Sequence, residues 1–114
     1  MDKIKKYQDI VINFLHFYHE TTGGNRGELN VSRRIIADKE SNSFQLLSVG
    51  WNGKHFVFSP IFHFDIIDGK VWMQCNNTEW ETVDYLMEQG VDRNDIVLGF
   101  VPPEARQYSG FAVI

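Results

Sequence analysis

The stretch HFDIIDGKVWMQ, residues 63–74, decides the fold because it contains two strand patterns and the turn between them. Hydrophobic and polar residues alternate on both sides of Asp68-Gly69, and such alternation is typical of half-buried β-strands. Asp-Gly between two strand patterns favours a two-residue turn, since both central residues of a type I′ turn need a positive φ. The stretch therefore predicts an antiparallel hairpin.

The register of this hairpin follows from its two-residue turn. The expected pairs are Ile67–Lys70, Ile66–Val71, Asp65–Trp72, Phe64–Met73, His63–Gln74 and Phe62–Cys75. Side chains alternate between the faces of a strand, so one face is wholly apolar. That apolar face holds Phe62, Phe64, Ile66, Val71, Met73 and Cys75. The opposite, mixed face holds Ile61, His63, Asp65, Lys70, Trp72, Gln74 and Asn76.

Three interpretations of the mixed face remain open. Antiparallel sheets commonly expose one face to water, which would make the face a solvated surface. A tryptophan among polar groups is typical of binding hot spots, which favours a partner or dimer surface. His63 and Asp65 stand two apart on one strand, so they could also act as a general base and the group that orients it. No nucleophile or metal ligand stands beside them at a recognisable spacing.

The rest of the chain extends the hairpin into an α+β fold. Apolar residues at spacings of three and four predict a helix over residues 3–20. Strand patterns over 31–37, 44–51 and 54–66, with Asn52-Gly53 as a turn and Pro60 as a bend or edge, complete an antiparallel meander of about four strands. Thr78 and Glu81 form a capping-box pattern that opens a second helix to about Gln89. A further strand over 96–101 and a docked C-terminal tail follow.

Length and composition limit the class of protein. A chain of 114 residues is the size of one domain, so we expect a single domain over 1–114. Cys75 is the only cysteine, which favours a reducing, cytoplasmic setting. The N-terminus lacks the apolar core of a secretory signal, and no run is long enough to span a membrane. A net charge of −4 disfavours direct binding to nucleic acid.

Other candidate sites give weaker signals. His16 and His19 lie three apart on the first helix, but their order is not that of a zinc protease, and surface histidines are the simpler interpretation. Cys75 is expected to be a buried structural thiol. The glycine-rich loop over 23–27 lacks the Lys-Ser/Thr ending of a phosphate-binding loop. Arg106, after a Pro-Pro-Glu-Ala loop, is expected to anchor a loop carboxylate or to contact a partner. No cofactor or metal is predicted.

A series of short blocks runs along the chain: VGW (49–51), HFDI (63–66), DGKVWMQ (68–74), NNTE (76–79), EQGV (88–91), DIVLGF (95–100), Pro103, Arg106 and FA (111–112). This series resembles the XisI family, known as fdxN element excision controlling factor. The order and spacing of the blocks carry the resemblance over essentially the whole chain. Gly90-Val91-Asp92, Pro102-Pro103 and the ending Ser109-Gly110-Phe111-Ala112 depart mildly from the family pattern.

The resemblance implies a process and a partner rather than a reaction. It implies a non-enzymatic accessory protein that controls excision of a DNA element together with a XisH-like, nuclease-related protein. A homodimer or higher oligomer is also expected. The candidate interface residues are His63, Asp65, Trp72, Gln74, Asn76 and Arg106. The alternative is a small hydrolase-type subunit that uses His63 and Asp65.

Overall fold

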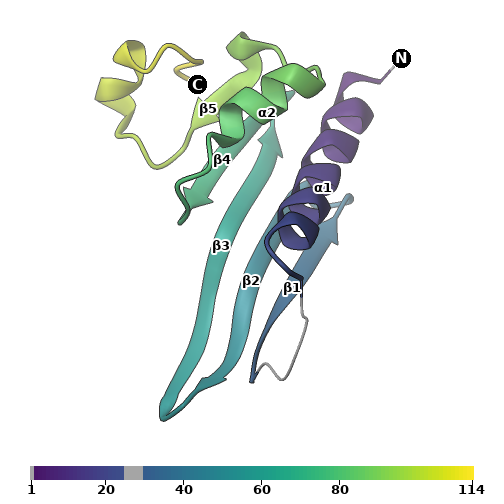
Figure 1. Ribbon diagram of the computed structural model, residues 1–114. Coiled ribbons are helices and arrows are strands. Elements are labelled where there is room, and N and C mark those ends of the chain that lie inside the picture. Colours follow the sequence, from purple (N-terminus) through teal and green to yellow (C-terminus); the bar gives the residue numbers. More distant parts are fainter. Residues whose placement is uncertain (1, 25–29) are drawn as a thin grey trace.

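The computed structural model describes residues 2–24 and 30–114 and shows an α+β fold in which helices lie on one face of a sheet (Figure 1). The described elements run from helix α1 through strands β1 to β4, helix α2, a 3-10 turn η1 and strand β5 to a 3-10 helix η2. The predicted fold class is therefore confirmed. Residues 25–27 of the predicted glycine-rich loop lie outside the described residues.

Helix α1 (Lys3–Thr21) begins where the Asp2 carboxylate accepts a hydrogen bond from the Ile4 N–H at 2.9 Å, which is the bond of an N-cap. Its apolar residues recur every three or four positions and so form one stripe. The buried hydrophobic members are Tyr7, Ile10, Val11, Phe14, Leu15 and Tyr18. Phe14 lies edge-on to Phe62 of β3, with 5.0 Å between ring centroids, so this stripe and the apolar side of the sheet form one core.

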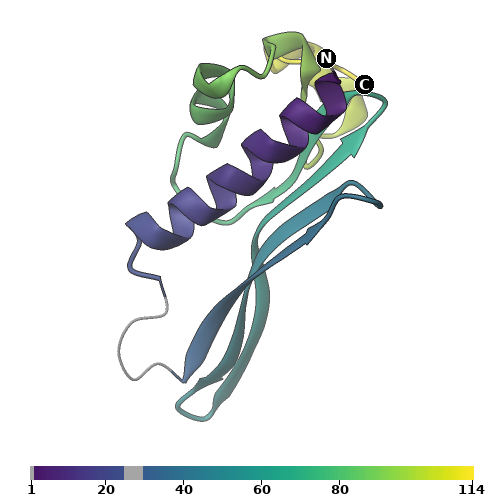
Figure 2. The same ribbon diagram turned by 90° about the vertical axis from the view of Figure 1, so that its right-hand side faces the viewer.

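The sheet has five strands in the order β1-β2-β3-β4-β5. Their bounds are β1 (Val31–Asp38), β2 (Ser43–Asn52), β3 (His55–Ile67), β4 (Lys70–Asn76) and β5 (Ile96–Leu98). The first four pair as an antiparallel meander, as predicted. β5 pairs with β4 in parallel, because α2 (Thr82–Gln89) lies between them in the chain and carries it back across the sheet. In Figure 2, α1 forms a layer on one side of the strands.

The turn of the opening hairpin has the predicted geometry. Asp68 and Gly69 both have positive φ, at 51° and 77°, as a type I′ turn requires. The four predicted pairs nearest the turn, from Ile67–Lys70 to Phe64–Met73, are confirmed.

A bulge then changes the register. His63 pairs with Cys75 and Phe62 with Asn76, so Gln74 is an extra residue without a partner on β3. The predicted pairs His63–Gln74 and Phe62–Cys75 are therefore wrong. A β-bulge shifts the pairing by one residue, and every side chain beyond it changes face.

Two predictions about faces change with this bulge. Cys75 shares the face of His63 and is only partly buried, rather than buried in the apolar face. Asn76 points to the helical side, where its amide donates to the Trp80 carbonyl at 3.2 Å. Ile61, which was also placed on the mixed face, packs against the core. It is the extra residue of a second bulge, since Leu46 pairs with Phe62 and Leu47 with Pro60.

The predicted capping box does not form. α2 begins at Thr82, its N-cap residue Glu81 makes no side-chain capping bond, and Gly90 ends it in a left-handed conformation. Thr78 is instead held in a turn by Asn76, whose Oδ1 accepts from the Thr78 backbone N–H at 2.9 Å. The Thr78 hydroxyl donates to the same oxygen at 2.6 Å and accepts from the Trp80 N–H at 3.1 Å, so it is occupied in this turn, ahead of the first residue of α2.

The chain after α2 docks on the sheet, as predicted for the tail. η1 (Arg93–Asp95) leads into β5, which ends at Leu98 and is shorter than the predicted strand over 96–101. The helix η2 (Pro103–Tyr108) and the following residues return to the sheet edge, where the Ala112 N–H donates to the Ile96 carbonyl at 2.8 Å.

The β2–β3 hairpin extends beyond α1 and forms an arm, residues 48–60 (Figures 1 and 2). Its turn residues are Gly53 and Lys54, because Asn52 pairs with His55. Asn52-Gly53 is therefore one position away from the central pair of the turn. Gly53 has a φ of 61° and Lys54 is not among the described residues with positive φ, which differs from the type I′ turn that Asn-Gly predicts.

Candidate recognition surface on the helix-free face of the sheet

The face of the sheet opposite α1 carries a polar cluster from three neighbouring strands. Ser43 and Gln45 come from β2, His63 and Asp65 from β3, and Gln74 from β4. We call these five residues the polar cluster. The face that carries them is called the helix-free face, because no α-helix in the described part of the chain covers it; Arg106 of the 3-10 helix η2 reaches it at Trp72. Cross-strand pairing of Ser43 with Asp65 and of Gln45 with His63 brings the members together.

Asp65 is the centre of the polar cluster. Its Oδ1 accepts from the Ser43 hydroxyl at 2.6 Å and lies 3.0 Å from the His63 Nε2. Its Oδ2 accepts from the Gln74 amide at 3.2 Å. Burial raises the pKa of Asp65, but the hydrogen bonds from Ser43 and His63 outweigh burial and hold this pKa below its ordinary value. The carboxylate is therefore ionised and accepts from three side-chain donors.

His63 is held at both ring nitrogens. Its Nε2 faces Asp65, and its Nδ1 lies 2.9 Å from the Gln45 side-chain oxygen. If the Nε2–H donates to the carboxylate, two cases remain for Nδ1. In a cationic ring Nδ1 donates to the Gln45 oxygen. In a neutral ring Nδ1 is an acceptor, and the Gln45 side chain must turn its amide nitrogen toward it. In either case no ring nitrogen points to an empty position, whereas a general base must reach a substrate proton.

Trp72 lies beside the polar cluster on β4 and is covered in part by the tail. The Arg106 guanidinium lies 5.0 Å from the centre of its ring, which is a cation–π distance. Arg106 is buried, and it donates to the carbonyls of Val101 at 3.0 Å and Gly99 at 3.3 Å. Arg106 therefore anchors its loop through carbonyl groups, where a carboxylate was expected.

The six predicted interface residues separate into two groups. His63, Asp65, Trp72 and Gln74 lie together on the helix-free face. Arg106 comes from the tail and joins them at Trp72. Asn76 leaves the group because of the bulge.

Ser43 and Gln45 are the members of the site that sequence reasoning missed. They could in principle be found from the sequence, because both lie on the strand that pairs with β3. However, a hairpin centred on Asn52-Gly53 would place Gln45 opposite Pro60 instead of His63. Both the displaced turn and the bulge at Ile61 are needed to bring Gln45 opposite His63 and Ser43 opposite Asp65.

Cys75 also lies on the helix-free face, next to the bulge. Its thiol is 3.8 Å from the Ile61 carbonyl, and partial burial raises its pKa. A raised thiol pKa lowers the fraction of thiolate and so the reactivity of the cysteine. A thiol of low reactivity agrees with the predicted structural role of Cys75, although Cys75 lies on the face of the sheet opposite to the predicted one.

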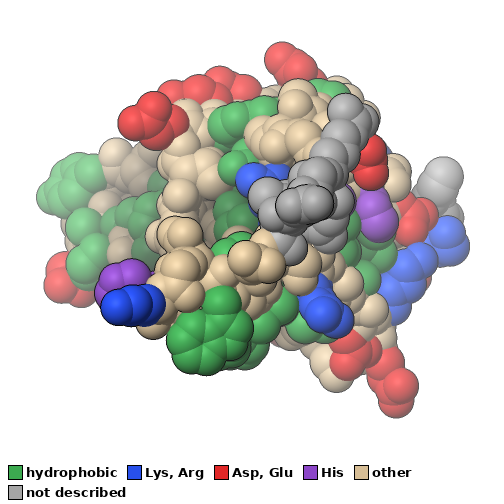
Figure 3. Space-filling view, turned by 60° about the horizontal axis from the view of Figure 1, so that its bottom comes forward, with side chains coloured by type: hydrophobic (Ala, Val, Ile, Leu, Met, Phe, Trp, Pro, Cys, Tyr) green, Lys and Arg blue, Asp and Glu red, His purple; other side chains and the backbone are tan. Residues whose placement is uncertain are grey.

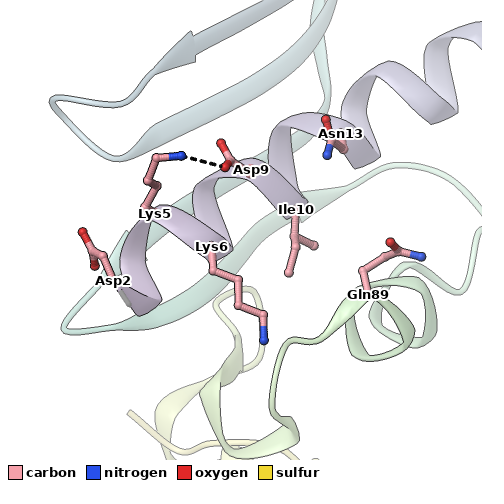
Figure 4. Close-up of a pocket in the computed structure, with 7 residues that line it drawn as sticks. All are labelled: Asp2, Lys5, Lys6, Asp9, Ile10, Asn13 and Gln89. Carbon is pink, nitrogen blue, oxygen red and sulfur yellow. Dashed lines mark hydrogen bonds and ion pairs between the residues drawn. The ribbon is translucent and has the colours of Figure 1, made fainter.

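A separate hollow of about 440 Å³ lies between α1 and the end of α2 (Figure 4). Its lining residues are Asp2, Lys5, Lys6, Asp9, Ile10, Asn13 and Gln89. Lys5 and Asp9 form an exposed ion pair at 3.3 Å across one turn of the helix, and such pairs contribute little to stability. None of the predicted interface residues lines this hollow.

Among residues 2–24 and 30–114, no group of three or more His, Cys, Asp and Glu side chains is arranged to hold a metal ion. The predicted pair His16 and His19 is therefore not joined by a further ligand within those ranges. No helix in the described part of the chain is both long and apolar enough to cross a membrane.

Comparisons with known proteins place the chain in a family. The sequence model of the XisI protein family matches residues 1–113. The chain belongs to the XisI family. Two solved structures of proteins from Anabaena variabilis ATCC 29413 have the same fold. No curated protein matches the chain.

The first of these structures is a XisI-like protein with 37% sequence identity and a TM-score of 0.89; the match covers 97% of this chain and 99% of that one. The second is the fdxN element excision controlling factor XisI, with 29% identity and a TM-score of 0.88, covering 99% of this chain and 100% of that one. The resemblance inferred from the sequence blocks is thus confirmed over nearly the whole length.

Proposed function

We propose that this protein is a non-enzymatic accessory factor that controls excision of a DNA element through contacts with a XisH-like, nuclease-related protein. The observation that carries the proposal is the full-length match to a solved XisI structure described as an fdxN element excision controlling factor. The acidic net charge of −4 supports action through another protein, since direct DNA binding relies on concentrated Lys and Arg.

The contact surface that we propose is the helix-free face around Trp72. A half-buried tryptophan beside charged and amide groups has the composition of an interface hot spot. The hydrogen bonds of Asp65 fix its neighbours in place before binding. A partner would therefore meet a preorganised surface and lose little side-chain entropy on binding.

An enzymatic role for His63 and Asp65 has less support. Asp65 already receives three donors, and both nitrogens of His63 face side-chain oxygens. Such a closed network positions side chains but leaves no free base for a substrate. We therefore assign the pair a positioning role within the surface.

The test is to co-express the chain with the XisH-like protein and to measure the affinity of the purified pair. We expect Trp72→Ala to weaken binding by at least tenfold, since central aromatic residues dominate interface energy. Trp72→Phe keeps an aromatic ring under Arg106 and should retain most of the affinity. This variant separates lost contact from local unfolding.

The matched control is Trp51→Ala, because Trp51 is also an exposed tryptophan but lies on the arm. It should leave the affinity for the XisH-like protein unchanged. Equal affinities for wild type and Trp72→Ala, with both proteins folded by circular dichroism, would remove Trp72 from the interface. Failure of the wild-type chain to bind any XisH-like protein would contradict the proposed partner.

A further inference from the structure

The arm carries exposed aromatic side chains that no described part of the chain covers. Trp51, Phe56 and Phe58 are 55%, 56% and 70% exposed. Trp51 and Phe56 pair across the hairpin, with ring centroids 5.2 Å apart, and Phe58 lies opposite Val49. Figure 3, which looks at the molecule from below Figure 1, shows hydrophobic side chains gathered at this end beside a histidine and a basic side chain. Exposed aromatic clusters of this kind mark interaction surfaces.

The arm also has a free strand edge. β4 pairs with β3 from Ile67 to Phe62 only, so among the described residues no strand lies beside residues 55–60 on that side. The direction of the backbone groups follows from β2. The Trp51 N–H donates to the Asn30 carbonyl on the β1 side, and hence away from β3. Its cross-strand partner Phe56 must then direct its own N–H and C=O away from β2.

The backbone N–H and C=O of Phe58 point the same way as those of Phe56, because the direction of these groups repeats every two residues along a strand. The free edge therefore offers two N–H and two C=O groups. Pro60 limits the edge because it has no N–H, and its carbonyl already accepts from the Asn77 amide at 2.9 Å. The turn at Gly53 and Lys54 limits it at the other end.

We infer that this edge pairs with the same edge of a second copy of the chain, antiparallel and across a two-fold axis at Val57. In that register Phe56 of one copy lies opposite Phe58 of the other, and each such pair exchanges two backbone hydrogen bonds. All four outward groups of both copies are then satisfied. The aromatic side chains of Phe56 and Phe58 meet across the new strand pair, which is a favourable cross-strand combination.

Charge favours a second copy of the chain at this place. Residues 48–60 contain Lys54 and no acidic residue, although the whole chain has a net charge of −4. Two acidic molecules can therefore meet at the arm without bringing carboxylates together. This inference does not depend on the proposed function, because the arm lies apart from the polar cluster and Trp72.

The exposed aromatic area on the arm indicates how stable the proposed dimer should be. A large aromatic side chain buries about 200 Å² when fully covered, so Phe56 and Phe58 on the paired strand supply roughly 250 Å² per copy. A standard stable interface needs about 800 Å² from each partner. The arm alone supplies less than half of that area, and we therefore expect a dimer that dissociates on dilution.

The first experiment measures the mass of the full chain by light scattering and sedimentation from about 1 μM to 1 mM, a range that brackets weak dimers. We expect a shift from monomer to dimer for the wild type. The double variant Phe56→Lys/Phe58→Lys should remain monomeric throughout. The matched control Phe100→Lys/Tyr108→Lys changes two other exposed aromatic residues and should dimerise like the wild type. A wild type that stays monomeric, or an arm variant that dimerises normally, would overturn the inference.

The second experiment tests the register in a Cys75→Ser background. The two copies of Val57 face each other in a non-hydrogen-bonded pair, about 4.5 Å between Cα atoms, which is within the range of disulfides. Val57→Cys should therefore form a crosslinked dimer under mild oxidation. Ser59→Cys is the control, because its counterpart is four residues away along the strand, roughly 13 Å. Crosslinking through Ser59→Cys but not through Val57→Cys would contradict edge pairing.

Discussion

At the scale of single residues, polar side chains fix contacts between segments that lie far apart in the chain. Asp65 ties three strands together through Ser43, His63 and Gln74. Tyr7 ties the first helix to η1 through Asp95, 88 positions later. Both contacts are partly buried, so the loss of one partner leaves a partly buried polar group with one hydrogen bond fewer.

Asp65 should make the free energy of unfolding decrease as the solution becomes acidic. Its pKa is lower in the folded chain than in the unfolded chain, so its stabilising contribution is present above the unfolded pKa of about 4 and is lost as pH falls through the folded value. We expect Asp65→Asn to be less stable at neutral pH and to lose less stability below about pH 4. Urea unfolding across pH measures this. An exposed control, Glu104→Gln, should follow the wild type, and parallel pH curves for Asp65→Asn and wild type would contradict the prediction.

Tyr7→Phe should destabilise the fold by about 1–3 kcal/mol, because it removes a donor from a partly buried carboxylate. The Tyr7 hydroxyl donates to the Asp95 Oδ2 at 2.6 Å and accepts from the Asp92 N–H at 3.3 Å. Burial and this bond to Asp95 raise the pKa of Tyr7 to about 12. The contribution is present below the unfolded pKa of about 10 and fades as pH rises toward 12.

Chemical denaturation of wild type and Tyr7→Phe at neutral pH checks the size of this effect. The difference between them should shrink in alkaline solution, where the wild-type phenol ionises. A difference that is negligible at neutral pH would show that the bond to Asp95 adds nothing to stability.

At the scale of elements, the sequence predicts the cores of helices and strands well and their ends less well. α1 and β1 to β4 match the predicted segments within one or two residues, because periodicity is a local property. The start of α2 was predicted too early, since Thr78 makes a turn with Asn76. β5 is shorter than its apolar run, because only Ile96 to Leu98 finds a partner in β4.

The arm depends on a glycine at position 50. Gly50 has a φ of 141°, and a Cβ there would lie 2.0 Å from the Asn30 carbonyl oxygen. Gly50→Ala should therefore push β1 away from β2 and cost about 2–3 kcal/mol. Gly53→Ala is the matched control, since Gly53 also has a positive φ but open space around it, and should cost about 1 kcal/mol. Thermal unfolding of the three proteins measures this order, and equal melting temperatures for the two variants would contradict it.

At the scale of the whole molecule, the fold is a sheet with its two α-helices on one face and a tail at one edge. The buried side chains of α1, α2, β3 and β4 belong to one cluster. The arm extends beyond this cluster and carries side chains that are exposed. Stability is therefore unevenly distributed along β3.

Hydrogen exchange in dilute solution should show this difference within one strand. We expect slow exchange over residues 62–66, where Phe62, Phe64 and Ile66 are buried, and fast exchange at the amides of Phe56 and Phe58, which point to the free edge. Mass spectrometry of short peptides measures both regions at once. Equal protection of the two regions at low concentration would contradict this view of the arm.

The sequence by itself determined the α+β class, the Asp68-Gly69 turn, the apolar face of the central hairpin except for Cys75 and, through ordered blocks, membership of the XisI family. These features depend on local periodicity, turn chemistry and residue spacing. Only the tertiary structure decided where the pairing register of the strands changes. The bulges at Gln74 and Ile61 moved Asn76 to the helical side, placed Cys75 on the other, and set Gln45 opposite His63. A bulge forms where packing with distant segments favours it, so alternation along one strand cannot locate it.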